Sequence, residues 1–122
     1  MPIPLRILHL EEDPSDSELV VLEMAAGGIA AQVLRVAKRE DFISAFEKNR
    51  FDLILAENSL PLFSGLSALA IAREKSPDIP FILVSGMVTE KTAIELLRCG
   101  VTDYVLKHQL SRLPSVVRQA LR

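Results

Sequence analysis

Short apolar runs alternate with amphipathic stretches along the whole chain. The apolar runs have the length and the polar boundaries of buried β-strands, and they lie at residues 5–10, 32–36, 52–56, 81–84 and 103–106. The third and fourth runs, in FDLILAE and PFILVSG, contain almost no polar residue. That pattern is typical of central strands in a parallel sheet that is covered on both faces.

The stretches between these runs carry helix signals. Ser15 and Glu18 form a capping-box pattern after the first run, and Gly27-Gly28 ends that stretch. A further helix is predicted over residues 90–99, ended by Gly100. Apolar residues at helical spacing define one face in each of the other stretches: Leu19, Leu22 and Ala26; Phe42, Ile43 and Phe46; Leu66, Leu69 and Ala70; and Leu113, Val117, Ala120 and Leu121.

Strand and helix therefore alternate five times, which predicts an α/β fold with a doubly wound parallel sheet. Right-handed crossovers place the carboxyl ends of all strands at one edge of such a sheet. Ligands of doubly wound proteins bind outside that edge, near the point where the strand order reverses. Polar residues that directly follow the strands are consequently the candidates for chemistry.

Acids, a hydroxyl and an ammonium follow the predicted strands. The stretch DLILAENSLP leads from the third strand into Glu57, and the other strands lead into Glu11, Glu12 and Asp13, into Ser85 and into Lys107. Two carboxylates about 4 Å apart repel by roughly 4 kcal/mol at an effective dielectric of 20, so one lysine does not balance several acids. Oxygen ligands on a sheet edge suit Mg²⁺. A metal, an ammonium and a hydroxyl beside a carboxylate are the parts needed to handle a phosphoryl group.

Four stretches resemble the response-regulator receiver domain of two-component signalling. They are ILHLEEDPSDSELV (7–20), FDLILAENSLPLFSG (51–65), PFILVSG (80–86) and GVTDYVLK (100–107), and together they cover nearly the whole chain. The resemblance implies a flavodoxin-like fold with five helices and five parallel strands in the order 2-1-3-4-5. It also implies that residues 1–122 are one receiver domain, excised from or fused to a longer signalling protein.

The resemblance further implies roles for most of the polar residues at the sheet edge. The implied residues are the magnesium ligands Glu12, Asp13, Glu57 and the backbone carbonyl of Ser59; the phosphoacceptor position, Glu57; and the phosphoryl-contact and switch residues Ser85, Tyr104 and Lys107. Position 57 departs from the family, in which the phosphoacceptor is Asp.

The additional methylene of Glu57 moves its carboxylate up to about 1.5 Å farther from the backbone. Magnesium requires near-ideal octahedral geometry, and a misplacement of about 1 Å can cost on the order of 10²-fold in rate. We therefore expect slow or absent phosphorylation and weakened Mg²⁺ binding. Either Glu57 pairs with Lys107 and partly imitates the activated state, or the domain acts as a non-phosphorylated interaction module, a pseudo-receiver.

By the resemblance, the domain couples a histidine kinase or a histidine phosphotransfer protein to an output, and it is not itself a turnover enzyme. It can be the receiver part of a larger histidine kinase. In the family, the output surface is built from the fourth helix, fifth strand and fifth helix. The same surface often makes receiver homodimers, so a homodimer through it is the expected form of self-association.

Composition and charge limit the cellular compartments and the classes of partner that fit this protein. The 122 residues carry a formal net charge of −2, and neither this charge nor the pI of about 5.7 is typical of a nucleic-acid surface. The single cysteine, Cys99, is expected to be a small core residue in a reducing compartment. The start of the chain does not read as a signal peptide, and no apolar run approaches the ~20 residues of a membrane span. We expect a cytoplasmic protein that binds neither membranes nor nucleic acid.

Two other classes fit the predicted fold less well. A magnesium-dependent phosphatase with an aspartate nucleophile usually has a second acid two residues after the nucleophile, where this chain has Ser59. A flavin-binding flavodoxin-like protein has a Ser, Thr and Gly-rich phosphate loop after the first strand, where this chain has EEDPSD. His9 and His108 are isolated and receive no role.

Overall fold

The computed structural model describes residues 3–58, 60, 62–86 and 89–122. Its strands are β1 (Leu5–Leu10), β2 (Ala31–Val36), β3 (Leu53–Ala56), β4 (Phe81–Ser85) and β5 (Asp103–Leu106). Its helices are α1 (Pro14–Ala26), α2 (Arg39–Lys48), α3 (Gly65–Lys75), α4 (Glu90–Arg98), the 3₁₀ helix η1 (Lys107–Arg112) and α5 (Leu113–Ala120).

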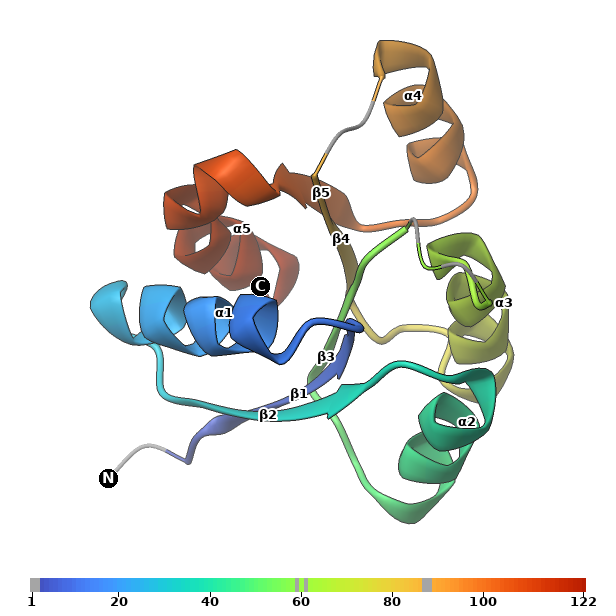
Figure 1. The fold of residues 1–122 in the computed structure, drawn as a ribbon, viewed down its shortest axis with the longest axis horizontal. Coiled ribbons are helices and arrows are strands. Elements are labelled where there is room, and N and C mark those ends of the chain that lie inside the picture. The colour runs from blue at the N-terminus through green and yellow to red at the C-terminus, as the bar shows by residue number, and fades with distance from the viewer. Residues whose placement is uncertain (1–2, 59, 61, 87–88) are drawn as a thin grey trace.

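Within these residues, five parallel strands form one sheet in the order β2-β1-β3-β4-β5, as predicted. Helices α1 and α5 cover one face of the sheet, and α2, α3 and α4 lie on the other (Figure 1). The strand order reverses between β1 and β3, so the carboxyl ends of these two strands flank the crevice in which doubly wound proteins bind ligands.

The alternation of side chains along the strands builds two cores, one on each face of the sheet. In β1, Leu8 and Leu10 point toward α2 and α3, whereas Ile7 packs with α1 and α5. Every residue of β3 and β4 is buried, which explains their uninterrupted apolar sequence. The two cores fix the positions of the residues that follow each strand.

Gly27 allows α1 to approach α5. A Cβ atom at this position would lie 2.4 Å from the Cβ of Pro114, closer than two carbon atoms can approach. Arg118 of α5 also donates a hydrogen bond to the Gly27 carbonyl. The glycine pair therefore ends the helix, as predicted, and its first member permits close packing of two helices.

Several details differ from the sequence-based predictions. Leu19, Leu22 and Ala26 of α1 are exposed, and the buried positions of this helix are Ser17, Val20 and Met24. In α3, Leu66 and Ala70 are exposed, and the helix buries Gly65, Ala68 and Ala72 together with the predicted Leu69. Cys99 is exposed rather than in the core, because it caps α4 at a position that faces solvent. The 3₁₀ helix η1 was not predicted, since its residues, KHQLSR, have no clear helical periodicity. No helix in the described ranges is both long and apolar enough to span a membrane.

Candidate functional site at the carboxyl edge of the sheet

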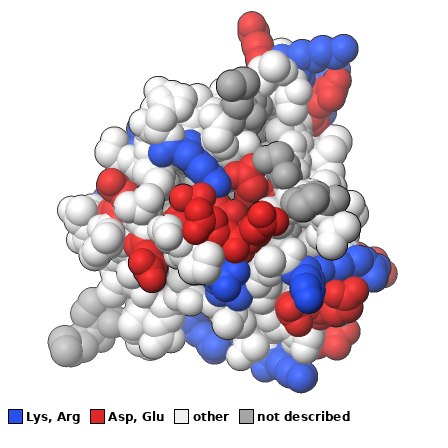
Figure 2. Space-filling view, in the orientation of Figure 1, with Lys and Arg blue, Asp and Glu red and all other residues white. Residues whose placement is uncertain are grey.

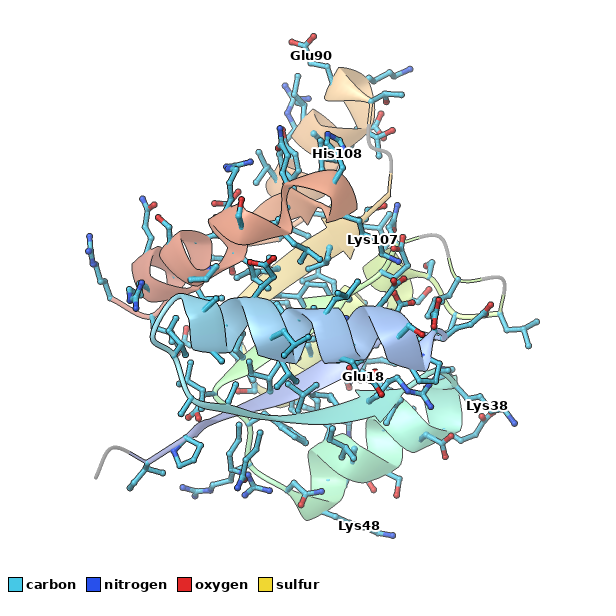
Figure 3. All side chains as sticks on the ribbon, turned by 60° about the vertical axis from the view of Figure 1, so that its left-hand side comes forward. Glu18, Lys38, Lys48, Glu90, Lys107 and His108 are labelled. Atoms are coloured by element: carbon cyan, nitrogen blue, oxygen red, sulfur yellow. The ribbon has the colours of Figure 1, made fainter. Side chains whose placement is uncertain are left out.

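Lys107 is the first residue after β5 and lies at the carboxyl edge of the sheet (Figure 3). Its ammonium nitrogen Nζ is 2.7 Å from Glu11 Oε1 and 2.7 Å from Asp16 Oδ2. The same nitrogen is 3.1 Å from Glu57 Oε2. Each of these carboxylates can accept one of the three N–H bonds of the ammonium. Residues from the ends of β1, β3 and β5 and from the first turn of α1 therefore meet at one cation.

Ser85 extends this arrangement to β4. Its hydroxyl donates a hydrogen bond of 3.0 Å to Glu57 Oε1, so the two carboxylate oxygens of Glu57 contact different residues, Ser85 and Lys107. Ser85 and Glu57 are both buried. We refer to Glu11, Asp16, Glu57, Ser85 and Lys107 as the Lys107 cluster.

The loop between β1 and α1 presents its acids in different ways. Glu11 is 3% exposed, and its Oε2 accepts the backbone N–H of Glu12. Asp13 is exposed and caps α1 by accepting the backbone N–H of Ser15. Arg35 of β2 donates to the backbone carbonyls of Glu11 and Glu12 at 3.1 and 3.4 Å, which holds the loop against the sheet.

Burial and charge pairing shift the pKa values of the cluster in opposite directions. Burial raises the pKa of the Glu11 carboxyl, against the opposing effect of Lys107. The hydrogen bond from Lys107 lowers the pKa of Asp16. Burial works against the charge of Lys107, but hydrogen bonds to Asp16, Glu11 and Glu57 outweigh it and raise the pKa of the ammonium. Lys107 is therefore charged throughout the physiological range.

His9 lies beneath the cluster, on the same face of β1 as Glu11. It is buried, and its Nδ1 is 3.0 Å from the hydroxyl of Ser17 in α1. Burial, reinforced by the charge of Lys107, lowers the pKa of His9 from 6.5 to about 4. The imidazole is therefore neutral at pH 7.

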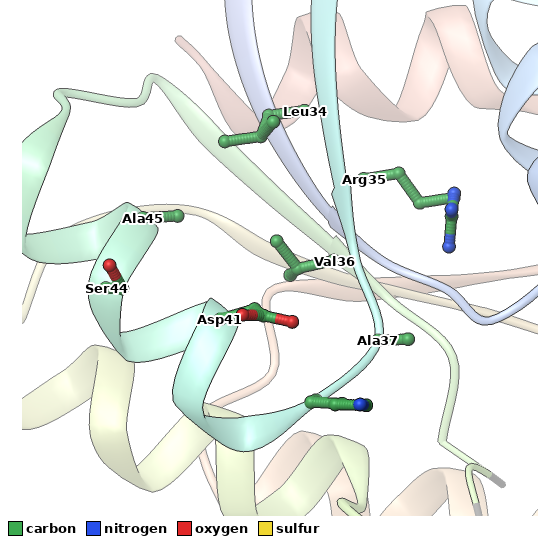
Figure 4. A pocket seen from close by; sticks show the side chains of 8 residues that line it. Leu34, Arg35, Val36, Ala37, Asp41, Ser44 and Ala45 are labelled. Carbon is green, nitrogen blue, oxygen red and sulfur yellow. The ribbon is translucent and has the colours of Figure 1, made fainter.

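An acid-lined cleft opens above the Lys107 cluster. Its volume is about 220 Å³, and its lining residues are Glu11, Glu12, Asp13, Asp16, Glu57, Leu60 and Lys107. Figure 2 shows acidic side chains gathered on this part of the surface. A hollow of about 430 Å³ between β2 and α2 has a different character, because Arg35, Lys38 and Asp41 are the charged residues of its lining (Figure 4). The cleft above the cluster is therefore the candidate site.

Comparison with known families is consistent with this geometry. The sequence model of the response regulator receiver domain matches residues 7–118. The chain belongs to the response regulator receiver domain family. Among curated relatives of this receiver domain, the regulatory protein LuxO of Vibrio cholerae is 33% identical over 88 residues, which are 71% of this chain and 19% of LuxO. The transcriptional regulatory protein ZraR of Salmonella typhimurium is 25% identical over 116 residues, 94% of this chain and 26% of ZraR. The chain thus spans about a fifth to a quarter of the length of these relatives.

Solved structures support the same fold. A response regulator from Chloroflexus aurantiacus J-10-fl superposes with a TM-score of 0.85 at 21% identity, covering 98% of both chains. The receiver domain of a sensor histidine kinase from Pseudomonas aeruginosa PAO1, solved with a magnesium ion in its active site cleft, gives 0.80 at 22% identity, also covering 98% of both chains. At these identities the similarity establishes the fold alone.

The receiver fold brings most of the predicted site residues to this edge. Glu57 contacts both Ser85 and Lys107, and Glu12 and Asp13 line the cleft from exposed positions. Tyr104 is half-buried and packs against the core on the side of α2 and α3. Ser59 lies outside the described residues.

Four residues of this edge were not assigned a role from the sequence: Glu11, Asp16, His9 and Arg35. The sequence contains one signal for two of them. His9 and Glu11 continue the inward alternation that begins at Ile7, so a strand prediction already directs both toward α1. Asp16 and Arg35 carry no such signal, because the ammonium that Asp16 pairs with and the carbonyls that Arg35 donates to are distant in the sequence.

The donor chemistry of the cleft fits a hard divalent cation, because its described lining contains five carboxylates and one ammonium. The arrangement of these carboxylates, however, does not match a metal site. Among the described residues, no group of three or more acid, His or Cys side chains is placed to hold a metal ion. The acids of the Lys107 cluster are directed at the ammonium instead.

Proposed function

We propose that this receiver domain couples a histidine kinase or a histidine phosphotransfer protein to an output, and that Glu57 occupies the phosphoacceptor position without serving as an efficient acceptor. Glu57 instead partly imitates the phosphorylated state. The output surface is formed by α4, β5 and α5, and it is also the surface for a homodimer. We propose that the output itself is produced by other domains of a longer signalling protein or by a separate partner.

One observation carries this proposal: the contacts of the Glu57 carboxylate. In the family, a hydroxyl and a lysine at these positions contact the phosphoryl group. Here Ser85 and Lys107 contact the two oxygens of Glu57 at 3.0 and 3.1 Å. A carboxylate carries a charge of −1, whereas a phosphoryl group carries about −1.5 to −2, so the imitation is partial.

The second part of this proposal concerns magnesium binding. Glu12, Asp13 and Glu57 are its proposed carboxylate ligands, and all three line the cleft, although Asp13 also caps α1. When bound, the ion would neutralise the oxygens of an incoming phosphoryl group. Magnesium binding requires Lys107 to release Glu57, which it now contacts, so we propose weak magnesium affinity in a cytoplasmic setting.

The experiment compares the wild-type domain with Glu57→Asp in Mg²⁺ and phosphoramidate, with intact mass as the readout. The carboxylate oxygen forms a bond to phosphorus, the P–N bond breaks, and ammonia leaves from the already protonated nitrogen. We expect Glu57→Asp to gain about 80 Da and the wild type to gain none over the same time. Asp52→Glu, at an exposed position beyond the opposite edge, is the matched control and should also gain none.

Glu57→Gln distinguishes partial imitation from an inert module. If Glu57 imitates the phosphoryl group, its neutralisation should shift the amide NMR signals of Ser85 and Tyr104 and of residues in α4. Shifts confined to the immediate neighbours of residue 57 would favour the non-phosphorylated pseudo-receiver. Phosphorylation of wild-type Glu57 at the rate of the Glu57→Asp variant would overturn the proposal.

A further inference from the structure

Glu11 and Asp16 are the two members of the Lys107 cluster to which the receiver resemblance gives no role, and Asp16 is the one that does not follow a strand. It lies in the first turn of α1, whereas Glu11, Glu57, Ser85 and Lys107 lie at the ends of strands or directly after them. Its Oδ2 is 2.7 Å from Lys107 Nζ, one of the two shortest contacts of that ammonium among the described residues. The Asp16 side chain is 31% exposed, so solvent reaches it from the cleft.

The contacts of Lys107 are divided between two sides of the cleft. Glu11 and Asp16 hold the ammonium from the side of β1 and α1 at 2.7 Å, and Glu57 reaches it from the side of β3 at 3.1 Å. An ammonium has three N–H donors, and the three carboxylates match them in number. Any additional acceptor at position 57, such as the oxygens of a phosphoryl group, must therefore compete with Glu11 or Asp16.

Asp16 is the more replaceable of these two competitors. Glu11 is buried and is fixed by a second hydrogen bond, from the backbone of Glu12. Asp16 is partly exposed, and the next residue, Ser17, contacts buried His9. The first turn of α1 is thus attached to the site at two consecutive positions, and Asp16 is the one that reaches the ammonium.

We propose that Asp16 is a positioning residue that holds Lys107 toward α1, in competition with residue 57 and with any phosphoryl group carried there. Its removal frees an N–H donor for position 57. The contact between Lys107 and the first turn of α1 depends on this aspartate. The part of this inference that concerns the phosphoryl group rests on the proposed function, whereas the part that concerns the lysine does not.

The position of the lysine is tested by NMR of ¹⁵N-labelled lysine ammonium groups, with Lys107→Met used to assign the Lys107 signal. Ion pairing in a partly buried site slows exchange of ammonium protons with water, so we expect a distinct Lys107 signal in the wild type. Asp16→Asn should shift this signal and speed its proton exchange on the order of tenfold, the lower end of the effect of losing one charge-assisted hydrogen bond.

Glu18→Gln is the matched control, because Glu18 is exposed on the same helix and its replacement removes the same charge. It should leave the Lys107 signal unchanged. Asp16→Glu retains the carboxylate and should restore slow exchange at least in part. A Lys107 signal that is identical in the wild type and in Asp16→Asn would overturn the proposal, whatever the outcome of phosphorylation.

The consequence for the phosphoryl group is tested in the Glu57→Asp background with Mg²⁺ and phosphoramidate. Adding Asp16→Asn should raise the phosphorylation rate on the order of fivefold, whereas adding Glu18→Gln should not. The comparison is made at about 0.5 M salt, where repulsion between separated charges is largely screened. Equal rates in the two double variants would contradict competition for Lys107. Absence of phosphorylation in Glu57→Asp itself would overturn the proposed function, while the NMR result would still decide the role of Asp16.

Discussion

The two edges of the sheet carry the same kinds of charged residue in different surroundings. At the amino edge, Asp52 accepts the backbone N–H of Arg6 in an exposed contact, and Lys75 pairs with Glu47 at 3.3 Å. The side chains of that pair are 35% and 59% exposed. At the carboxyl edge, Lys107 pairs with Glu11, whose side chain is only 4% exposed. The two edges therefore differ in the burial of their ion pairs and not in the types of residue that form them.

The topology of a parallel sheet accounts for this difference. The carboxyl ends of β1 and β3 diverge at the point where the strand order reverses, which leaves a crevice between the following loops. Side chains that enter the crevice are shielded from water and meet one another. At the amino edge, α2 and α3 end at exposed residues, and charged side chains extend into solvent.

The largest difference between the two edges is expected in the pH dependence of the free energy of unfolding, to which buried His9 at the carboxyl edge contributes. In the unfolded chain His9 binds a proton below about pH 6.5, but in the folded protein it does so only below about pH 4. Stability is therefore lost as the pH falls from 6.5 to 4. Because each pKa unit corresponds to about 1.4 kcal/mol, the loss should approach about 3 kcal/mol.

Urea unfolding at a series of pH values measures this loss. The His9→Gln variant should lack this contribution between pH 6.5 and 4, whereas His108→Gln, at an exposed position, should retain it. If the free energy of unfolding of His9→Gln fell with pH as steeply as that of the wild type, groups other than His9 would cause the acid sensitivity.

Lys107→Met should have the next largest effect. It leaves buried Glu11 and Glu57 without the cation that they contact, and an uncompensated buried charged group costs about 1–3 kcal/mol or more. We therefore expect a loss of about 1–3 kcal/mol in the free energy of unfolding at pH 7, measured in urea. A variant as stable as the wild type would mean that the cleft is hydrated well enough to make the lysine dispensable.

Lys75→Met, at the opposite edge, should have the smallest effect. Exposed ion pairs contribute about 0–1 kcal/mol, so removal of the Lys75–Glu47 pair should change the free energy of unfolding by less than about 0.5 kcal/mol. The same urea titration in low and high salt provides the measurement. A loss as large as that of Lys107→Met would remove the distinction between the two edges.

Much of the fold could be predicted because its signals are local. The apolar runs of β3 and β4 and the pattern DYVL of β5 identify strands by composition alone. The inner face of α1 could not be identified in this way. This helix has apolar residues on more than one side, so spacing favoured Leu19 and Leu22, whereas packing against the sheet selected Val20 and Met24.

The candidate site also contains residues that local sequence signals predicted and residues that only the tertiary structure placed. Glu57, Ser85 and Lys107 directly follow strands, and the rule that parallel strands end at one edge was enough to bring them together. The sequence did not show which of the three acids after β1 enters the Lys107 cluster. Three consecutive acids have the same local sequence signal, but the backbone directs Glu11 into the cluster and Asp13 to the helix cap.

The sequence by itself determined the alternation of strands and helices, the family and the presence of Glu57 at the end of β3, because each depends on residues close together in the chain. Only the tertiary structure decided that Lys107 contacts Asp16 and that His9 is buried beneath it. Lys107 and Asp16 are 91 residues apart. The contact of two such residues, and the water excluded around them, depends on how the helices pack against the sheet.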